Sequence, residues 1–115
     1  MQDCLFCKII NGEISGKFVY KDKTLVAFYD INPKAPVHVL VVPVKHLRSL
    51  QDIKEDDEKL LGQLMLAVQK IAQKLGIAAD GYKVVINNGQ ASGQLVFHLH
   101  VHLLGGWKKS IHWVV

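Results

Sequence analysis

This chain of 115 residues is poor in the features that mark several special classes of protein. It has only two cysteines, and no apolar run approaches the roughly 20 residues that a membrane span needs. Two cysteines exclude a fold held together by several disulfides. The first residues do not place a basic segment before an apolar one, so no signal peptide is predicted. We therefore expect a cytoplasmic protein with no membrane partner.

The sequence also lacks a strong excess of charge of one sign. Its formal net charge is +4, and the basic residues are scattered, with only Lys108 and Lys109 adjacent to each other. This distribution is too diffuse for a nucleic-acid groove, although it is compatible with a small anionic ligand. Hydrophobic residues make up 50% of the chain, which is enough for one domain, over 1–115, to bury a core without disulfides.

The two cysteines form a Cys-x-x-Cys motif at Cys4 and Cys7. In a cytosolic chain such a motif indicates metal binding or redox chemistry rather than a structural disulfide. A redox motif of the thioredoxin kind follows a strand and opens a helix, whereas only three residues precede Cys4 here. The motif by itself supplies two of the four ligands of a structural zinc.

Hydrophobic periodicity predicts an α+β domain with an antiparallel sheet of about five strands, one long helix and one short helix. The expected helices cover residues 4–10 and 52–75, and the expected strands cover 17–21, 24–29, 37–43, 82–87 and 97–104. Short connections favour antiparallel neighbours, so we expect a meander with the helices packed on one face. Met65 and Leu66 widen the apolar stripe of the long helix beyond what one sheet face needs, which predicts a homodimer through this helix.

Three of the six histidines alternate with apolar residues in the stretch from Phe97 to Leu104. A strand there would place His98, His100 and His102 on one face and the apolar side chains on the other, towards a core. Three unpaired imidazoles in a core would cost several kcal/mol of desolvation. Two functional interpretations remain: the imidazoles bind a metal, or they carry out nucleophilic and acid–base chemistry.

The nucleophilic interpretation fits the surrounding sequence better. Three residues in one row of a strand span about 13 to 14 Å, so they cannot easily share one metal ion. No Asp or Glu lies near the motif to support a catalytic metal. The loop over 88–94, with its two glycines, offers backbone N–H groups for a phosphate. A neutral imidazole attacks phosphorus well near neutral pH and needs no metal or other cofactor for that step.

The sequence His98-Leu-His100-Val-His102-Leu-Leu resembles the signature of the histidine triad (HIT) family of nucleotide hydrolases and transferases. The resemblance extends over nearly the whole chain and includes residues 5–14, 27–31, 35–38, 87–89 and 93–94. Gly105-Gly106 and His112-Trp113 resemble the Hint branch, whose members are homodimeric purine nucleoside phosphoramidases. These enzymes cleave AMP joined to amines such as lysine, through a covalent nucleotidyl-histidine intermediate.

The resemblance implies a role for each matching residue. His100 would be the nucleophile on the α-phosphate, His102 would contact the phosphate oxygens, and His38 would lie behind His100 and orient it through a hydrogen bond. Asp30 would accept hydrogen bonds from the ribose hydroxyls, and Trp113 would lie near the active site of the partner subunit. The residues expected to line the phosphate are Asn87, Gly93 and Gln94, and those expected around the purine are Leu5, Phe6, Ile9, Ile14, Phe28, Ile31 and Leu40.

Some members of the family that carry Cys-x-x-Cys near the N-terminus bind a structural zinc. The matching ligand set in this chain is Cys4, Cys7, His46 and His98, and all four positions are filled. A zinc there would give the first histidine of the triad a structural task. In the alternative, His98 makes only hydrogen bonds and the thiols are free.

The chain departs from the family pattern at Leu95, where many Hint members carry a serine that hydrogen-bonds the leaving group. The tail between Gly106 and His112 also differs from that of the best-known relatives. Two alternative functions therefore stay open: hydrolysis of dinucleoside polyphosphates, as in a neighbouring branch of the family, or binding of nucleotide or zinc by an interaction protein with little catalysis.

Overall fold

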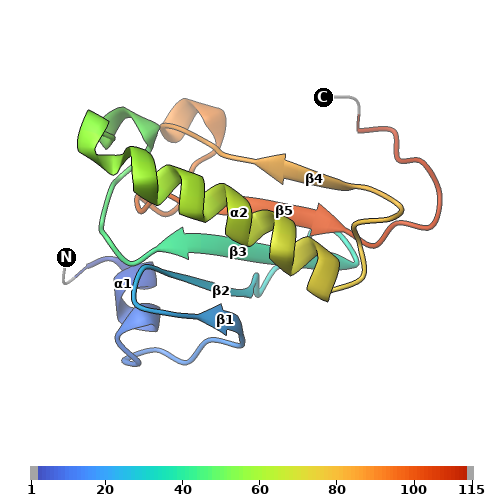
Figure 1. The fold of residues 1–115 in the computed structure, drawn as a ribbon, viewed down its shortest axis with the longest axis horizontal. Coiled ribbons are helices and arrows are strands. Elements are labelled where there is room, and N and C mark those ends of the chain that lie inside the picture. Colours follow the sequence, from blue (N-terminus) through green and yellow to red (C-terminus); the bar gives the residue numbers. More distant parts are fainter. Residues whose placement is uncertain (1–2, 114–115) are drawn as a thin grey trace.

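A computed structural model describes residues 3–113 and places an antiparallel five-stranded sheet at the centre of the molecule (Figure 1). The helices are α1 (Leu5–Ile10) and α2 (Glu58–Lys74), and the strands are β1 (Phe18–Lys21), β2 (Leu25–Tyr29), β3 (Val37–Pro43), β4 (Tyr82–Val85) and β5 (Val101–Gly105). The expected α+β class, the short first helix, the hairpin and the central strand are confirmed. No helix within residues 3–113 is long and apolar enough to cross a membrane.

The strand order is β1-β2-β3-β5-β4, so the predicted simple meander is wrong. The first three strands follow one another, but β5 lies between β3 and β4 and pairs with both. Val101 and Leu103 of β5 are completely buried, whereas Val84 of β4 is 42% exposed. The more apolar strand, β5, is therefore an inner strand of the sheet, and β4, whose side chains are more exposed, forms the edge.

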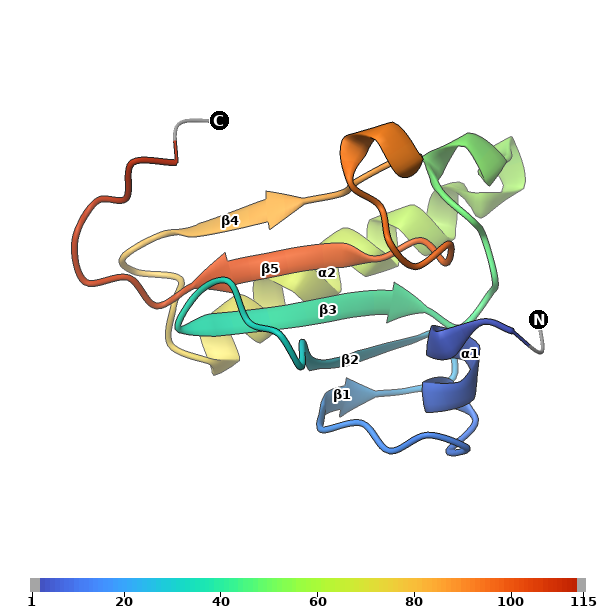
Figure 2. The ribbon, with the colours of Figure 1, turned by 180° about the vertical axis from the view of Figure 1, so that it is seen from behind.

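The two helices cover opposite faces of the sheet, which corrects the expectation that they share one face. Figure 2, seen from behind, shows α1 lying in front of the sheet and α2 behind it. Leu64, Val68 and Ile71 of α2 pack on one face, while Phe6 and Ile9 of α1 pack on the other. The physical reason is that β2 and β3 are buried on both faces, so each face needs its own cover.

The long helix begins later than predicted, at Glu58 rather than at residue 52. Two short 3₁₀ turns, Leu50–Asp52 and Glu55–Asp57, precede it. The Asp57 carboxylate accepts the backbone N–H of Lys54 and pairs with Lys45, which stabilises the 3₁₀ turn that leads into the helix. The end is as expected, because Gly76 adopts a φ of +73° directly after the last turn.

The histidine stretch is not one continuous strand, because β5 begins only at Val101. His98 and His100 precede it, and the backbone N–H of Leu99 donates to the Leu47 carbonyl, 2.6 Å away, instead of to a strand of the sheet. The alternation of side chains is nevertheless as predicted, because Leu99 and Val101 are completely buried in the apolar interior. The sequence pattern thus assigned the faces correctly and the strand boundary incorrectly.

Candidate active site

His38 and His102 form a hydrogen-bonded pair on the sheet face that α1 covers. They belong to the neighbouring strands β3 and β5, and His38 Nε2 lies 2.9 Å from His102 Nδ1. The backbone N–H of Lys34 donates to His38 Nδ1 at 3.0 Å, so that nitrogen carries a lone pair. Neutral His38 therefore has its proton on Nε2 and donates it to His102 Nδ1. This leaves the proton of neutral His102 on Nε2, where it can be donated to an anion.

His100 is oriented by a backbone carbonyl rather than by His38. Its Nδ1–H donates to the carbonyl oxygen of His98, 2.7 Å away. The expectation that His38 hydrogen-bonds His100 is therefore wrong, because His38 is already committed to His102. With the proton held on Nδ1, neutral His100 has its lone pair on Nε2, which is the form that a nucleophile needs.

Burial keeps these imidazoles neutral. It is the largest cause that lowers the pKa of His38 and of His100 below the ordinary value of 6.5. Burial, and then the neighbouring histidines His100 and His38, lower the pKa of His102 to about 4. At neutral pH the site therefore presents uncharged rings, one with a free lone pair and one with a free N–H.

The residues expected around the purine divide into a buried and an exposed group. Phe6 packs edge-on against His100, with ring centroids 4.9 Å apart, and also contacts Phe28. The buried members lie in one apolar cluster and are Phe6, Ile9, Phe28 and Leu40. The exposed members are Leu5, Ile14 and Ile31, of which Ile31 is 89% exposed. The buried group forms the wall behind His100, and the exposed group is accessible from solvent.

The remaining nucleotide-binding candidates lie on two loops beside the histidines. Asp30 follows β2, and its carboxylate lies 3.5 Å from His38 Nε2. Asn87 follows β4, and Gly93 adopts a φ of +98°, which lets the loop turn there. The Gln94 side chain is buried, accepts from Gly89 N–H and donates to two carbonyls. Its amide is thus used to shape the loop.

Cys4, Cys7, His46 and His98 converge at one point and form what we call the Cys₂His₂ cluster; their ligand atoms all lie within 4.8 Å of one another. His98 Nδ1 is 3.3 Å from Cys4 Sγ and 3.1 Å from His46 Nδ1, and Cys7 Sγ is 3.4 Å from His46 Nδ1. A tetrahedral zinc with bonds of about 2.3 Å to sulfur and about 2.0 Å to nitrogen separates its ligand atoms by about 3.3 to 3.8 Å. The three measured separations, 3.1 to 3.4 Å, lie near the lower end of this range.

The protonation of the cluster also suits a zinc ion. His98 Nε2–H donates to the Pro43 carbonyl at 2.7 Å, so its lone pair is on Nδ1, facing the thiols. Burial, followed by the hydrogen bond and charge of Cys4, raises the pKa of Cys7 to about 11. A bound cation would favour the thiolate form of Cys7 against this cost. These four residues fit a structural zinc.

A second group of ligand-type side chains, Asp30, His38 and His102, is equally compact but suits a metal less well. The Lys34 N–H occupies the lone pair of His38 Nδ1, so neutral His38 must keep its proton on Nε2, the atom that faces the other two side chains. The local backbone thus assigns this group to proton donation rather than to metal binding.

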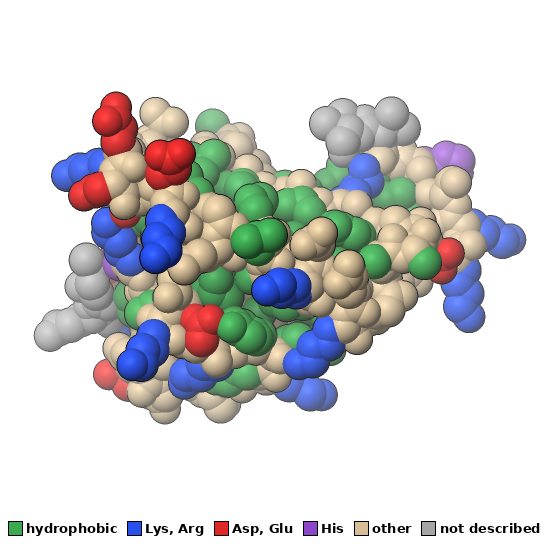
Figure 3. Space-filling view, viewed as in Figure 1, with side chains coloured by type: hydrophobic (Ala, Val, Ile, Leu, Met, Phe, Trp, Pro, Cys, Tyr) green, Lys and Arg blue, Asp and Glu red, His purple; other side chains and the backbone are tan. Residues whose placement is uncertain are grey.

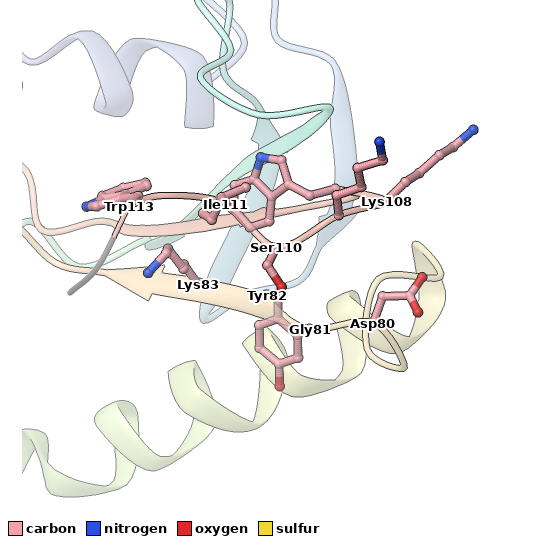
Figure 4. Close-up of a pocket in the computed structure, with 10 residues that line it drawn as sticks. Asp80, Gly81, Tyr82, Lys83, Lys108, Ser110, Ile111 and Trp113 are labelled. Carbon is pink, nitrogen blue, oxygen red and sulfur yellow. The ribbon is translucent and has the colours of Figure 1, made fainter.

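Trp113 does not share a pocket with the triad histidines of its own chain. It lines a pocket of about 420 Å³ against the edge of the sheet, beside Lys83, whose Nζ is 5.1 Å from its ring (Figure 4). None of the triad histidines lines this pocket. Whether Trp113 reaches the active site of a partner subunit stays a prediction. Leu95 is 89% exposed and lines a different cavity, together with Cys4 and His46.

Comparison with known proteins agrees with this geometry. The sequence model of the HIT domain family matches residues 11–109 of this chain. This chain belongs to the HIT family. It is 47% identical to the protein HitA of Neisseria gonorrhoeae over 91% of this chain and 97% of HitA. A HIT family hydrolase from Clostridium thermocellum has 43% identity and a TM-score of 0.93, with 99% of each chain covered. A histidine triad nucleotide-binding protein from Candida albicans has 34% identity and a TM-score of 0.78, over 95% of this chain and 85% of that one.

Three contacts of this HIT-family site were not found from the sequence. They are the Lys34 N–H, the Pro43 carbonyl and the His98 carbonyl, each of which determines the proton position of one histidine ring. All three are backbone groups, which every residue type carries, so the sequence contains no signal for them.

We predict that His102 stays neutral in the folded protein well below pH 6. Its pKa is lowered to about 4 in the folded state, whereas the unfolded chain takes up the proton near pH 6.5. The resulting contribution to stability is complete above pH 6.5 and is lost as the pH falls towards 4. Long-range ¹H–¹⁵N NMR of the histidine rings measures this directly. Titration of His102 between pH 6 and 7 would contradict the prediction.

Proposed function

We propose that this protein hydrolyses the P–N bond of purine nucleoside 5'-phosphoramidates, such as AMP joined to lysine. The observation that carries the proposal is the hydrogen bond from His100 Nδ1–H to the His98 carbonyl, which leaves the Nε2 lone pair free. A buried, neutral imidazole of this kind is suited to covalent catalysis on phosphorus. The C. thermocellum relative is described as a hydrolase and the C. albicans relative as nucleotide-binding, and both descriptions support the proposal.

The proposed reaction has two displacements at the α-phosphorus. His100 Nε2 forms a bond to phosphorus as the P–N bond to the amine breaks, and the leaving nitrogen takes a proton from solvent, so that a neutral amine departs. The His98 carbonyl accepts the hydrogen bond from the ring, which carries a positive charge in the nucleotidyl-histidine. His102 Nε2–H donates to a phosphate oxygen where negative charge develops. Water then attacks phosphorus and loses a proton to solvent, the bond to His100 Nε2 breaks, and AMP and neutral His100 are released.

Replacement of the nucleophile tests the proposal. His100→Ala should lower the hydrolysis of AMP–lysine or tryptamine adenosine phosphoramidate by on the order of 10³-fold or more, as loss of a nucleophile does in other enzymes. Wild-type protein that is quenched during turnover should carry AMP, and the variant should carry none. His112→Ala, which changes an exposed histidine of the tail, is the matched control.

Equal turnover by His100→Ala and wild type would exclude this mechanism. A substrate panel that includes dinucleoside polyphosphates distinguishes the other hydrolytic activity of the family, which would use the same histidine. AMP binding without turnover of any substrate in the panel would instead support a nucleotide-binding protein with little catalysis.

We also propose that Cys4, Cys7, His46 and His98 hold one structural zinc ion. Purified wild-type protein should contain about one zinc per chain, and Cys7→Ser should contain much less, because a hydroxyl is a far weaker ligand than a thiolate. Elemental analysis by mass spectrometry makes the measurement. Arg48→Ala, which changes a neighbouring side chain that is no ligand, serves as the control. Equal zinc content in wild type and Cys7→Ser would refute the site.

The proposed assembly is a homodimer through α2. Met65 and Leu66 of this helix are 43% and 56% exposed, and Val84 of the edge strand β4 is 42% exposed. Hydrophobic side chains gather over the middle of the α2 face in Figure 3. Leu66→Glu should halve the mass in sedimentation equilibrium, because a buried charge is costly at such an interface. Leu95→Glu is the control, and an unchanged mass for Leu66→Glu would argue against this interface.

A further inference from the structure

His98 takes part in two interactions at once, one through its ring and one through its backbone. Its Nδ1 lies 3.3 Å from Cys4 Sγ and 3.5 Å from Cys7 Sγ, inside the Cys₂His₂ cluster. Its carbonyl accepts the Nδ1–H of His100 at 2.7 Å. The residue is completely buried, so neither group can exchange its partner for water. A rotation of this residue would therefore disturb the cluster and His100 together.

Outside the cluster, the buried Leu99 side chain and two hydrogen bonds hold this segment of the chain. His98 and His100 lie before β5, outside the regular ladder of the sheet. The described attachments are the His98 Nε2–H bond to Pro43 and the Leu99 N–H bond to Leu47, at 2.7 and 2.6 Å. His46, adjacent to Leu47, contacts the His98 ring through Nδ1 at 3.1 Å. The cluster thus fastens this segment to the loop after β3.

Helix α1 provides a second connection between the cluster and His100. Cys4 caps the helix, and its sulfur accepts the N–H of Cys7 at 3.3 Å. Phe6, between the two cysteines, packs against the His100 ring at an interplanar angle of 88°. A helix of six residues is not stable alone, so its position depends on the packing and on what holds its thiols. The cluster therefore affects the position of the Phe6 ring.

We infer that Cys4, Cys7 and His46 are positioning residues for the reaction and that zinc in the Cys₂His₂ cluster acts on His100 through the His98 carbonyl and the Phe6 ring. With zinc bound, the His98 carbonyl keeps the His100 proton on Nδ1 and leaves Nε2 free. Without zinc, the segment before β5 has fewer restraints, and a fraction of His100 takes the other tautomer or turns away. The inference rests on the proposed role of His100 as nucleophile.

The test compares two substitutions of one ligand that differ by a single atom. His46→Cys keeps a zinc ligand and converts the cluster to Cys₃His, a common structural zinc set. His46→Ser has the same shape but does not hold the metal well. Each variant is analysed for zinc. Wild-type protein treated with a chelator, measured before and after zinc chloride is added back, gives the same comparison without a substitution.

Two readouts separate positioning from mere stability. We expect zinc-free protein to lose about 10- to 100-fold in kcat, the range seen when groups behind a reactive site are removed, with KM within about twofold. The ¹⁵N NMR signals of the His100 ring should change from a single Nδ1–H tautomer to a mixture. His46→Cys with zinc should resemble wild type in both measurements.

The control is Val68→Ala, which opens a cavity in the core on the α2 face and lowers stability without touching the site. It should leave kcat and the His100 tautomer unchanged. A zinc-free protein with unchanged kcat and an unchanged His100 tautomer would overturn the inference. If wild type hydrolyses no phosphoramidate, the proposed function fails, but the NMR comparison still decides whether the cluster orients His100.

Discussion

The site depends on one hydrogen bond, in which His100 Nδ1–H donates to the carbonyl of His98. A neutral imidazole has one N–H and one lone pair, and a carbonyl oxygen accepts only, so this contact leaves the lone pair on Nε2. The carbonyl is in the right place because the ring of His98 is fixed on its other side by Pro43 and the thiols. The chemistry of the second histidine therefore depends on how the first one is held.

Contacts with backbone groups give chemically identical histidines different proton positions. The Lys34 N–H makes His38 a donor through Nε2, and His38 in turn makes His102 a donor through Nε2. The Pro43 carbonyl makes His98 an acceptor through Nδ1, which suits a metal. The fold thus gives three histidines of one alternating motif different proton positions: a free lone pair on His100 Nε2, a free N–H on His102 Nε2 and a lone pair on His98 Nδ1.

Local pattern was a good guide to elements and a poor guide to their arrangement. The alternation around His98, His100 and His102 correctly placed the intervening side chains in the core, because side-chain direction has a period of two in extended chain. The strand order and the separation of the helices were wrong, since they depend on which faces of β2 and β3 need cover. The predicted start of α2 was also wrong, because the Asp52 carboxylate accepts the N–H of Arg48 and two 3₁₀ turns precede the helix.

The amino-acid sequence alone determined which side chains can do chemistry: three alternating imidazoles, a fourth at His38, and a Cys-x-x-Cys that can complete a ligand set with His46. It determined these because residue type and spacing are local properties. The structure brings His98 to the thiols, as the family resemblance implied. Only the tertiary structure decided that His38 hydrogen-bonds His102 and that a carbonyl orients His100. Those contacts involve backbone groups and join segments that are far apart in the chain. No local sequence pattern specifies such contacts.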